Sequence, residues 1–246
     1  MRQKKLLLML ALLCAVAQGA WAQNGIYCTA SDKNRVVCTD GTIYDNVAAA
    51  TADGKTAAAM IIYIDEVNKK GLALALKDEA RNTQDGGITA CNNKNTSMPV
   101  VGGTWKLASK SEWDSMISAA GSSPTLHDGF SSVGGTNMDV NVYWSSEKNG
   151  SNGLLLQYSR GWSDFVSNSQ YANIRACLTF NLLTLYAIGS QSEWIDFCNA
   201  GNTFIDKYVK LTSDIIVSEM AGSSESNSFQ GLFDGDGHTL TVSYNT

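Results

Sequence analysis

Runs of β-forming and alternating residues in the first half of the chain predict antiparallel strands. Residues 57–65 are rich in β-forming types, residues 68–71 have a turn composition, and residues 71–76 alternate leucine with glycine or alanine. Alternation with a period of two places the large side chains on one face of a strand. We therefore expect a central antiparallel hairpin. It is preceded by strands at residues 26–28 and 36–44, and residues 39–42 (TDGT) have the polar and Gly residues of a turn.

A helical period begins after residue 109. Ser109 and Glu112 have the spacing of a capping box, in which each side chain satisfies a backbone N–H group at a helix start. The apolar residues that follow recur at i, i+3, i+4 and i+7 and form one face: Trp113, Met116, Ile117 and Ala120. Gly121 suits a left-handed helix end. The pattern predicts a helix that buries Trp113 in the core rather than presenting it to a ligand.

Further strands are expected in the second half, at residues 143–144 and 154–158. The second of these alternates between two faces, one with Leu154, Leu156 and Tyr158 and the other with Leu155 and Gln157. If the first face is buried, Leu155 is exposed, which is unusual for a leucine. After a turn at Gly161, the pattern leaves open whether Trp162 or Phe165 is buried.

The N-terminus has the features of a secretory signal peptide. Three basic residues precede an apolar run over residues 6–17, and Ala20-Trp21-Ala22 supplies the small residues that signal peptidase requires. The run is shorter than the roughly 20 residues of a membrane span. We expect cleavage after Ala22, a signal peptide over residues 1–22, and a secreted or cell-surface protein with no later membrane insertion.

The charge balance disfavours two classes of partner. Removal of the signal peptide leaves fifteen basic against twenty-three acidic residues, a net charge of −8. Nucleic acids and anionic membranes are bound through clustered Lys and Arg. We therefore expect neither as a partner.

Cysteine usage fits an oxidising compartment, where disulfides persist. Five cysteines remain after cleavage: Cys28, Cys38, Cys91, Cys177 and Cys198. A local bridge between Cys28 and Cys38 and a longer one between Cys91 and Cys177 are both compatible with the sequence, which does not fix connectivity. The alternative, that several are buried apolar residues, stays open. With no Cys-x-x-Cys pair and only two histidines, a zinc site is not expected.

Three segments in a fixed order carry a resemblance to a known family. They are Trp105 to Trp113 (WKLASKSEW), Tyr143 to Glu147 (YWSSE) and Ile174 to Phe180 (IRACLTF). This layout resembles the C-type-lectin-like domain, and in particular secreted gut-bacterial proteins that include the ligand-binding variable proteins of diversity-generating retroelements. Ala108 replaces the proline usual at the helix entry. The resemblance implies an α+β fold over residues 23–180, with antiparallel strands and few helices.

The resemblance also implies a ligand-binding surface in the second half of that domain. The positions that match diversified ones are Lys148, Asn149, Asn152, Leu155, Gln157, Arg160, Trp162 and Asp164. Aromatic and Arg side chains dominate binding hot spots, so Trp162, Arg160 and Gln157 are the leading candidates. The alternative is that Trp162 belongs to the core and Arg160 is a solvated turn residue.

The sequence gives little support for metal or catalytic chemistry. Trp162-Ser163-Asp164 is similar to the Trp-Asn-Asp calcium motif of C-type lectins, but Ser163 replaces the coordinating Asn and no Glu-Pro-Asn or Gln-Pro-Asp triplet occurs. An oxidase of the formylglycine-generating type, which shares the fold, needs a pair of reactive cysteines. His127 is expected in a surface turn without a catalytic role. We expect no metal, no cofactor and no enzymatic activity.

Residues 181–246 have a different character and are interpreted as a second module. Ser190 and Glu193 precede a short apolar helix pattern, and residues 208–211 and 215–217 are strand-like. Residues 229–240 (FQGLFDGDGHTL) resemble the turn of bacterial right-handed β-helix repeats. A solenoid needs about three repeats to bury its edges, and the motif indicates little more than one. The module is therefore expected to be an incomplete β-helix, from a longer surface protein or packed on the first domain.

Together these features predict an exported, non-enzymatic protein that recognises a protein or glycan on another cell, phage or host surface. Recognition would use exposed side chains of the C-type-lectin-like domain and no calcium. The alternatives are a structural segment of a surface stalk without a specific ligand, or a formylglycine-generating-like oxidase.

Overall fold

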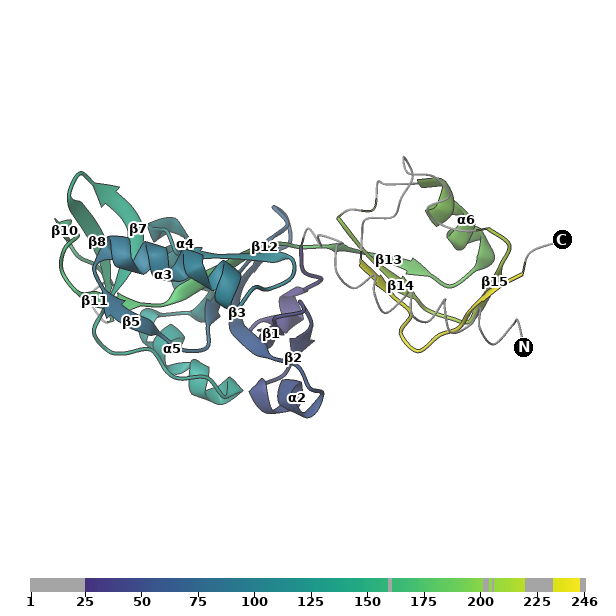
Figure 1. Cartoon of the computed structure of the whole chain (residues 1–246), viewed down its shortest axis with the longest axis horizontal. Helices are drawn as coiled ribbons and strands as arrows, with labels where there is room; N and C mark the ends of the chain where they lie inside the picture. The colour runs from purple at the N-terminus through teal and green to yellow at the C-terminus, as the bar shows by residue number, and fades with distance from the viewer. Residues whose placement is uncertain (1–24, 159–160, 201–203, 205, 220–231, 244–246) are drawn as a thin grey trace. The chain divides into compact units, whose positions relative to one another are not determined.

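The computed structural model describes residues 25–158, 161–200, 204, 206–219 and 232–243. Over these residues the chain is mixed α+β, with mostly antiparallel sheets and five α-helices (Figure 1). It divides into two compact units, Asn24–Leu183 and Thr184–Thr246. The second unit begins three residues after the expected position 181. The expected signal peptide lies outside the described residues.

The first unit contains a six-stranded antiparallel sheet. Its strands, in spatial order, are β2 (Ile43–Tyr44), β1 (Val36–Cys38), β3 (Ala57–Asp65), β4 (Lys70–Ala75), β12 (Ala176–Asn181) and β6 (Gly103–Leu107). The predicted central hairpin is confirmed as β3 and β4. Residues 36–44 form the two strands β1 and β2, and the chain turns between them at Gly41, where φ is +83°, within the turn expected at residues 39–42.

A second sheet carries Tyr143 to Glu147, one of the three segments that resemble the lectin-like family. Its strands, in spatial order, are β10 (Val166–Ser167), β8 (Asn152–Gln157), β7 (Val142–Asn149), β11 (Ala172–Ile174) and β5 (Glu79–Asn82). The short strand β9 (Gly161–Trp162) also pairs with β8. β7 and β8 form an antiparallel hairpin, whereas β11 runs parallel to β7.

Helices cover both faces of the six-stranded sheet. α4 (Lys110–Ala120) is the predicted helix, with the capping box of Ser109 and Glu112 and a left-handed Gly121. The others in this unit are α2 (Val47–Ala52), α3 (Gln84–Ser97) and α5 (Ser123–Asp128), with 3-10 turns η2 (Ala30–Asp32) and η3 (Phe130–Val133). Trp113 is fully buried, as predicted.

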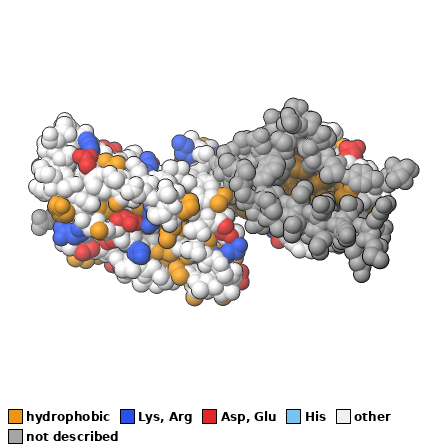
Figure 2. All heavy atoms as spheres, viewed as in Figure 1, with side chains coloured by type: hydrophobic (Ala, Val, Ile, Leu, Met, Phe, Trp, Pro, Cys, Tyr) orange, Lys and Arg blue, Asp and Glu red, His pale blue; other side chains and the backbone are white. Residues whose placement is uncertain are grey.

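Alternating side chains of β3 divide the core into two clusters. Ile61 packs in a cluster that includes Cys91 of α3, whereas Met60 and Ile62 pack with Trp113 of α4. The second sheet contributes to both clusters as well. On the face of the first unit that Figure 2 shows, acidic and basic side chains are interspersed rather than gathered into one patch.

The second unit stacks parallel strands in register. β13 (Thr184–Ile188), β14 (Lys207–Leu211) and β16 (Leu232–Asp234) form one ladder, and β15 (Ile215–Val217) pairs with β17 (Leu240–Val242). The predicted short helix is present as α6 (Gln191–Ala200), whose Trp194 and Phe197 enter a separate core. Three strands in one ladder exceed the little more than one repeat that the motif indicated.

The five cysteines of the described region are free thiols, so neither expected bridge is present in the structure. Cys28, Cys38, Cys91 and Cys177 are buried. Burial raises the pKa of Cys28 and of Cys91 to about 12, which keeps both protonated at neutral pH. These thiols therefore behave as small apolar core residues. Among the described helices, none is long and apolar enough to cross a bilayer.

Candidate ligand-binding face

The β7–β8 hairpin is the frame on which the candidate residues lie. Tyr143 pairs with Leu156 at its base, and Asn149 pairs with Asn152 beside the turn. The pairing shifts between Trp144 and Lys148, so residues 145–147 bulge out of the ladder. A bulge leaves backbone groups without strand partners, and these groups need other donors and acceptors.

Gln84, the first residue of α3, supplies the donors. Its Nε2 lies 2.7 Å from the carbonyl oxygens of both Ser145 and Glu147, and the side chain is fully buried. On β8, a Cβ atom at Gly153 would lie 2.5 Å from Oε1 of Gln84. The β7 bulge, Gln84 and Gly153 therefore pack closely against one another.

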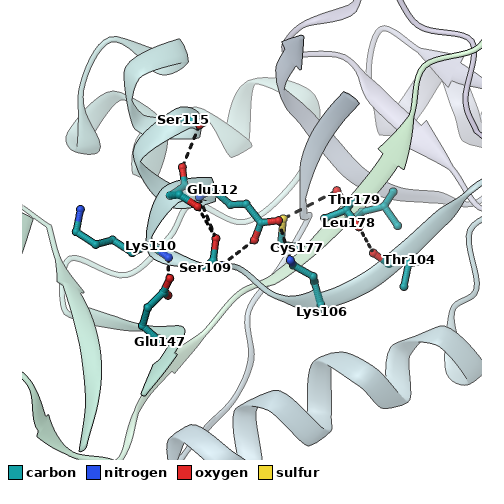
Figure 3. A network of polar contacts seen from close by, with 11 residues as sticks. Thr104, Lys106, Ser109, Lys110, Glu112, Ser115, Glu147, Cys177, Leu178 and Thr179 are labelled. Carbon is teal, nitrogen blue, oxygen red and sulfur yellow. Dashed lines mark hydrogen bonds and ion pairs between the residues drawn. The ribbon is translucent and has the colours of Figure 1, made fainter. Parts of the chain in front are cut away.

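Charged contacts fix the hairpin to two helices. Lys148 forms an ion pair with Asp85 of α3. On the other side, Oε2 of Glu147 accepts a hydrogen bond of 2.6 Å from the backbone N–H of Lys110, at the start of α4 (Figure 3). The N–H of Ser146 donates to the carbonyl of Ala108 at 2.9 Å. The hairpin is thus held between α3 and α4.

Strand alternation divides the candidate residues between two faces. Asn152 and Leu156 share a face of β8, and Leu156 packs in the cluster that contains α4. Residues directly opposite these two point the same way, which places the following residues on this α4-side face: Asn149 and Ser167 opposite Asn152, and Trp162 opposite Leu156. Lys148 and Gln157 point to the α3 side.

The expectation that Leu155 is exposed is wrong. Leu155 is 6% exposed and packs in the α3-side cluster with Trp144, its partner across the hairpin. The sheet is covered on both sides, so neither face of β8 is wholly free. Of the other candidates, Gln157 is half-buried and Asp164 is exposed, while Arg160 lies outside the described residues.

Trp162 is half-buried and held by polar partners. Its Nε1 donates to Oδ1 of Asp114 at 2.7 Å, and Nζ of Lys110 lies 5.1 Å from the ring centroid. Partial burial raises the pKa of Asp114, but hydrogen bonds from Lys110 and Trp162 outweigh it and bring the pKa below its ordinary value. The indole therefore borders the α4-side face in a fixed orientation, with its ring packed beside the core.

Two exposed aromatic residues were not among the candidates. Phe165 is 42% exposed and Tyr171 is 64% exposed. Val166 packs against the α3-side cluster, so Ser167, the next residue of β10, points toward the α4-side face. Phe165 directly precedes β10, and the same alternation extended by one residue predicts that it lies on this side. Tyr171 lies elsewhere, before β11 and beside Arg81, which donates to its carbonyl at 2.9 Å. The open choice between Trp162 and Phe165 as the buried residue was the sequence signal for Phe165.

A buried charge network supports the other end of β7. Arg175 is fully buried, and its Nε lies 2.8 Å from Asp78, which also accepts a hydrogen bond of 2.6 Å from the Tyr143 hydroxyl. Arg175 further donates to the carbonyls of Ala75 and Thr136, at 3.0 and 2.8 Å. Burial raises the pKa of Asp78 and lowers that of Arg175. The network ties the connection before β7 to the six-stranded sheet.

The expected surface position of His127 is also wrong. His127 is fully buried in α5, with Nδ1 2.7 Å from the Ser123 carbonyl and its ring edge-on to Tyr158 and Tyr143, at 4.9 and 5.6 Å between centroids. Burial lowers the pKa of His127, so the imidazole is neutral. Because the Ser123 carbonyl oxygen can only accept a hydrogen bond, Nδ1 of His127 carries the proton, and Nε2 has a buried lone pair. Nowhere in the described ranges do three or more metal-ligating side chains gather.

Comparison of the chain with models of known protein families finds no match, and comparison with curated protein sequences finds none either.

Proposed function

We propose that the first unit is a C-type-lectin-like recognition domain of a secreted or cell-surface protein. It binds a protein or glycan on another surface without a metal ion or cofactor. The contact surface is the α4-side face, with Phe165 at its centre, Asn152 and Ser167 beside it, and Trp162 at its border. Lys148, Gln157 and Leu155 are not part of this surface.

The observation that carries the proposal is the exposure of Phe165 directly before β10, whose Ser167 pairs with Asn152 of the β7–β8 hairpin. Large aromatic groups supply much of the binding energy of recognition surfaces, and amides and hydroxyls add adaptable hydrogen bonds. A rigid frame loses little conformational entropy when a ligand binds. Here Gln84 and Glu147 provide that rigidity.

A binding screen with the purified chain tests the proposal. The probes are glycan arrays and panels of host and phage surface proteins, and each ligand found is measured again with Phe165→Ala and Asn152→Ala. Loss of a hot-spot side chain is expected to weaken binding by about tenfold or more. The matched control is Val67→Ala, in the β3–β4 turn, where the side chain is 89% exposed. Equal binding by all three variants would overturn the assignment of the face.

The export step has its own test. Mass spectrometry of the secreted chain is expected to give a mature N-terminus at Gln23. Retention of residues 1–22 on the secreted protein would contradict cleavage after Ala22.

A second candidate function, a stalk segment without a ligand, is favoured by the parallel in-register ladder of the second unit. The DNA that surrounds the gene helps to distinguish the two functions. A neighbouring reverse transcriptase with an adenine-substituted template repeat supports a diversified receptor. Absence of any ligand in the screen supports the stalk.

A further inference from the structure

Two segments of the chain have the Asn-x-Ser/Thr pattern of acceptors for asparagine-linked glycans, and the structure separates them. They are Asn95-Thr96-Ser97 and Asn149-Gly150-Ser151. The transfer reaction needs an asparagine whose side-chain amide is not held in other hydrogen bonds. It also needs the Ser or Thr hydroxyl two residues later in the chain, with both residues in an exposed turn. The pattern alone does not distinguish the two sites.

Asn149 meets these requirements. It ends β7 at the tip of the hairpin and is exposed, and Gly150 makes the turn with φ at +59°. A Cβ atom at Gly150 would meet no atom within 4 Å, so the tip is open on its outer side. Within the described part of the chain, no side-chain hydrogen bond holds the Asn149 amide. The Ser151 side chain is exposed in the same turn. The Ser151 carbonyl accepts a hydrogen bond of 3.0 Å from the backbone N–H of Asn168, directly after β10.

Asn95 does not meet them. It lies inside α3, and its side-chain amide pairs with the backbone of the edge strand β6 as another strand would. Nδ2 donates to the carbonyl of Trp105 at 2.9 Å and to that of Asn92 at 3.0 Å, and Oδ1 accepts from the Trp105 N–H at 2.7 Å. The nitrogen that would react is therefore already a donor in two hydrogen bonds. Glycosylation here requires local opening of α3 from β6.

We propose that Asn149, and not Asn95, is an acceptor site for an asparagine-linked oligosaccharide in the folded protein. The donor is an oligosaccharide on a polyprenyl pyrophosphate, and a transferase supplies the base. Nδ2 of Asn149 forms a bond to the anomeric carbon, the bond from that carbon to the pyrophosphate oxygen breaks, the amide loses one proton to the base, and the lipid pyrophosphate leaves. The inference does not depend on the recognition function.

A glycan at this position has a consequence for the recognition face. Asn149 lies opposite Asn152 and points to the same side of the hairpin. An attached oligosaccharide would take Asn149 out of direct ligand contact and screen the hairpin end of the α4-side face. Glycosylated and unglycosylated chains are therefore expected to differ in the size of the ligand that can bind to this face.

The test uses the purified full chain, a single-subunit oligosaccharyltransferase and a lipid-linked oligosaccharide, with peptide mapping by mass spectrometry. The folded chain is compared with the same chain unfolded in urea and diluted into the reaction. We expect the folded chain to carry one glycan at Asn149, and Asn95 to react at least about tenfold more slowly because it must first open locally. In the unfolded chain both sites are expected to react.

Two variants keep the result interpretable. Asn149→Gln and Ser151→Ala are each expected to abolish modification of the folded chain, and circular dichroism shows that they fold. The proposal is overturned if Asn95 reacts as fast as Asn149 in the folded chain. It is also overturned if Asn149 stays unmodified in the folded chain while a standard acceptor peptide in the same tube is glycosylated.

Discussion

Replacement of Gln84 tests how the candidate face is held in place. The side chain is fully buried and donates two hydrogen bonds of 2.7 Å to the carbonyls of the β7 bulge. Gln84→Met keeps the length and most of the volume of the side chain but removes both donors. The carbonyl of Ser145 is then left buried without this donor, and the carbonyl of Glu147 is left partly buried.

The expected cost follows from these two groups. A buried polar group that loses its partner costs about 1–3 kcal/mol, and a partly buried one costs less because water can replace the donor. Oε1 of Gln84 has no hydrogen-bond partner within the described residues, so its removal returns part of that cost. We expect Gln84→Met to lower the free energy of unfolding of the first unit by about 2–3 kcal/mol.

Urea denaturation followed by tryptophan fluorescence measures this change, and hydrogen exchange of the β7–β8 amides shows where it acts. The matched control is Gln170→Met, an exposed glutamine in the same unit, which is expected to change stability by less than about 0.5 kcal/mol. The reasoning fails if Gln84→Met is as stable as Gln170→Met, or if it is destabilised while exchange in the hairpin is unchanged.

Three further predictions concern the buried groups around the face. The free energy of unfolding is expected to fall as the pH drops below about 6.5. In this range the histidine of the unfolded chain binds a proton, whereas the buried His127, whose pKa is lowered, does not. Urea titrations at several pH values should show a weaker pH dependence of stability for His127→Asn. Arg175→Met leaves the half-buried Asp78 without its cation and is expected to cost at most about 3–5 kcal/mol. Addition of Asp78→Asn should recover part of this cost in a double-mutant cycle. Gly153→Ala is expected to cost about 1–3 kcal/mol by overpacking, and less in a Gln84→Ala background, as thermal denaturation of the four proteins would show.

Elements defined by local sequence could be predicted, and the reason is visible in α4. Ser109, Glu112 and Gly121 specify its two ends, and its apolar period specifies the buried face. The β3–β4 hairpin was predictable for the same reason, because a turn and an alternating strand are adjacent in the chain. In both cases the signal lies within about a dozen residues.

The helix α3 could not be predicted from its own sequence. It contains two adjacent glycines and three asparagines and has no apolar stripe, so propensity argues against it. Contacts distant in sequence stabilise it instead. Cys91 is buried in the core, and Gly87 lies so close to Ile174 that a Cβ atom there would be 2.2 Å from the isoleucine side chain.

The missed helix explains the error at Leu155. Alternation correctly separated Leu155 from Leu156, but it does not tell how many faces of a strand are covered. Because α3 covers the second face, Leu155 is buried and the exposed aromatic of the segment is Phe165. The candidate face therefore had to be reassigned from side-chain packing, which the sequence does not contain.

The most direct test of the central claim is the dissociation constant of a ligand from the binding screen, measured for Phe165→Ala and Tyr171→Ala side by side. Both residues are exposed aromatics of the first unit, but only Phe165 belongs to the proposed contact surface. We predict binding at least about tenfold weaker for Phe165→Ala and within about twofold of the unmodified chain for Tyr171→Ala. The reverse order, or equal affinities for both variants, would contradict recognition through this face.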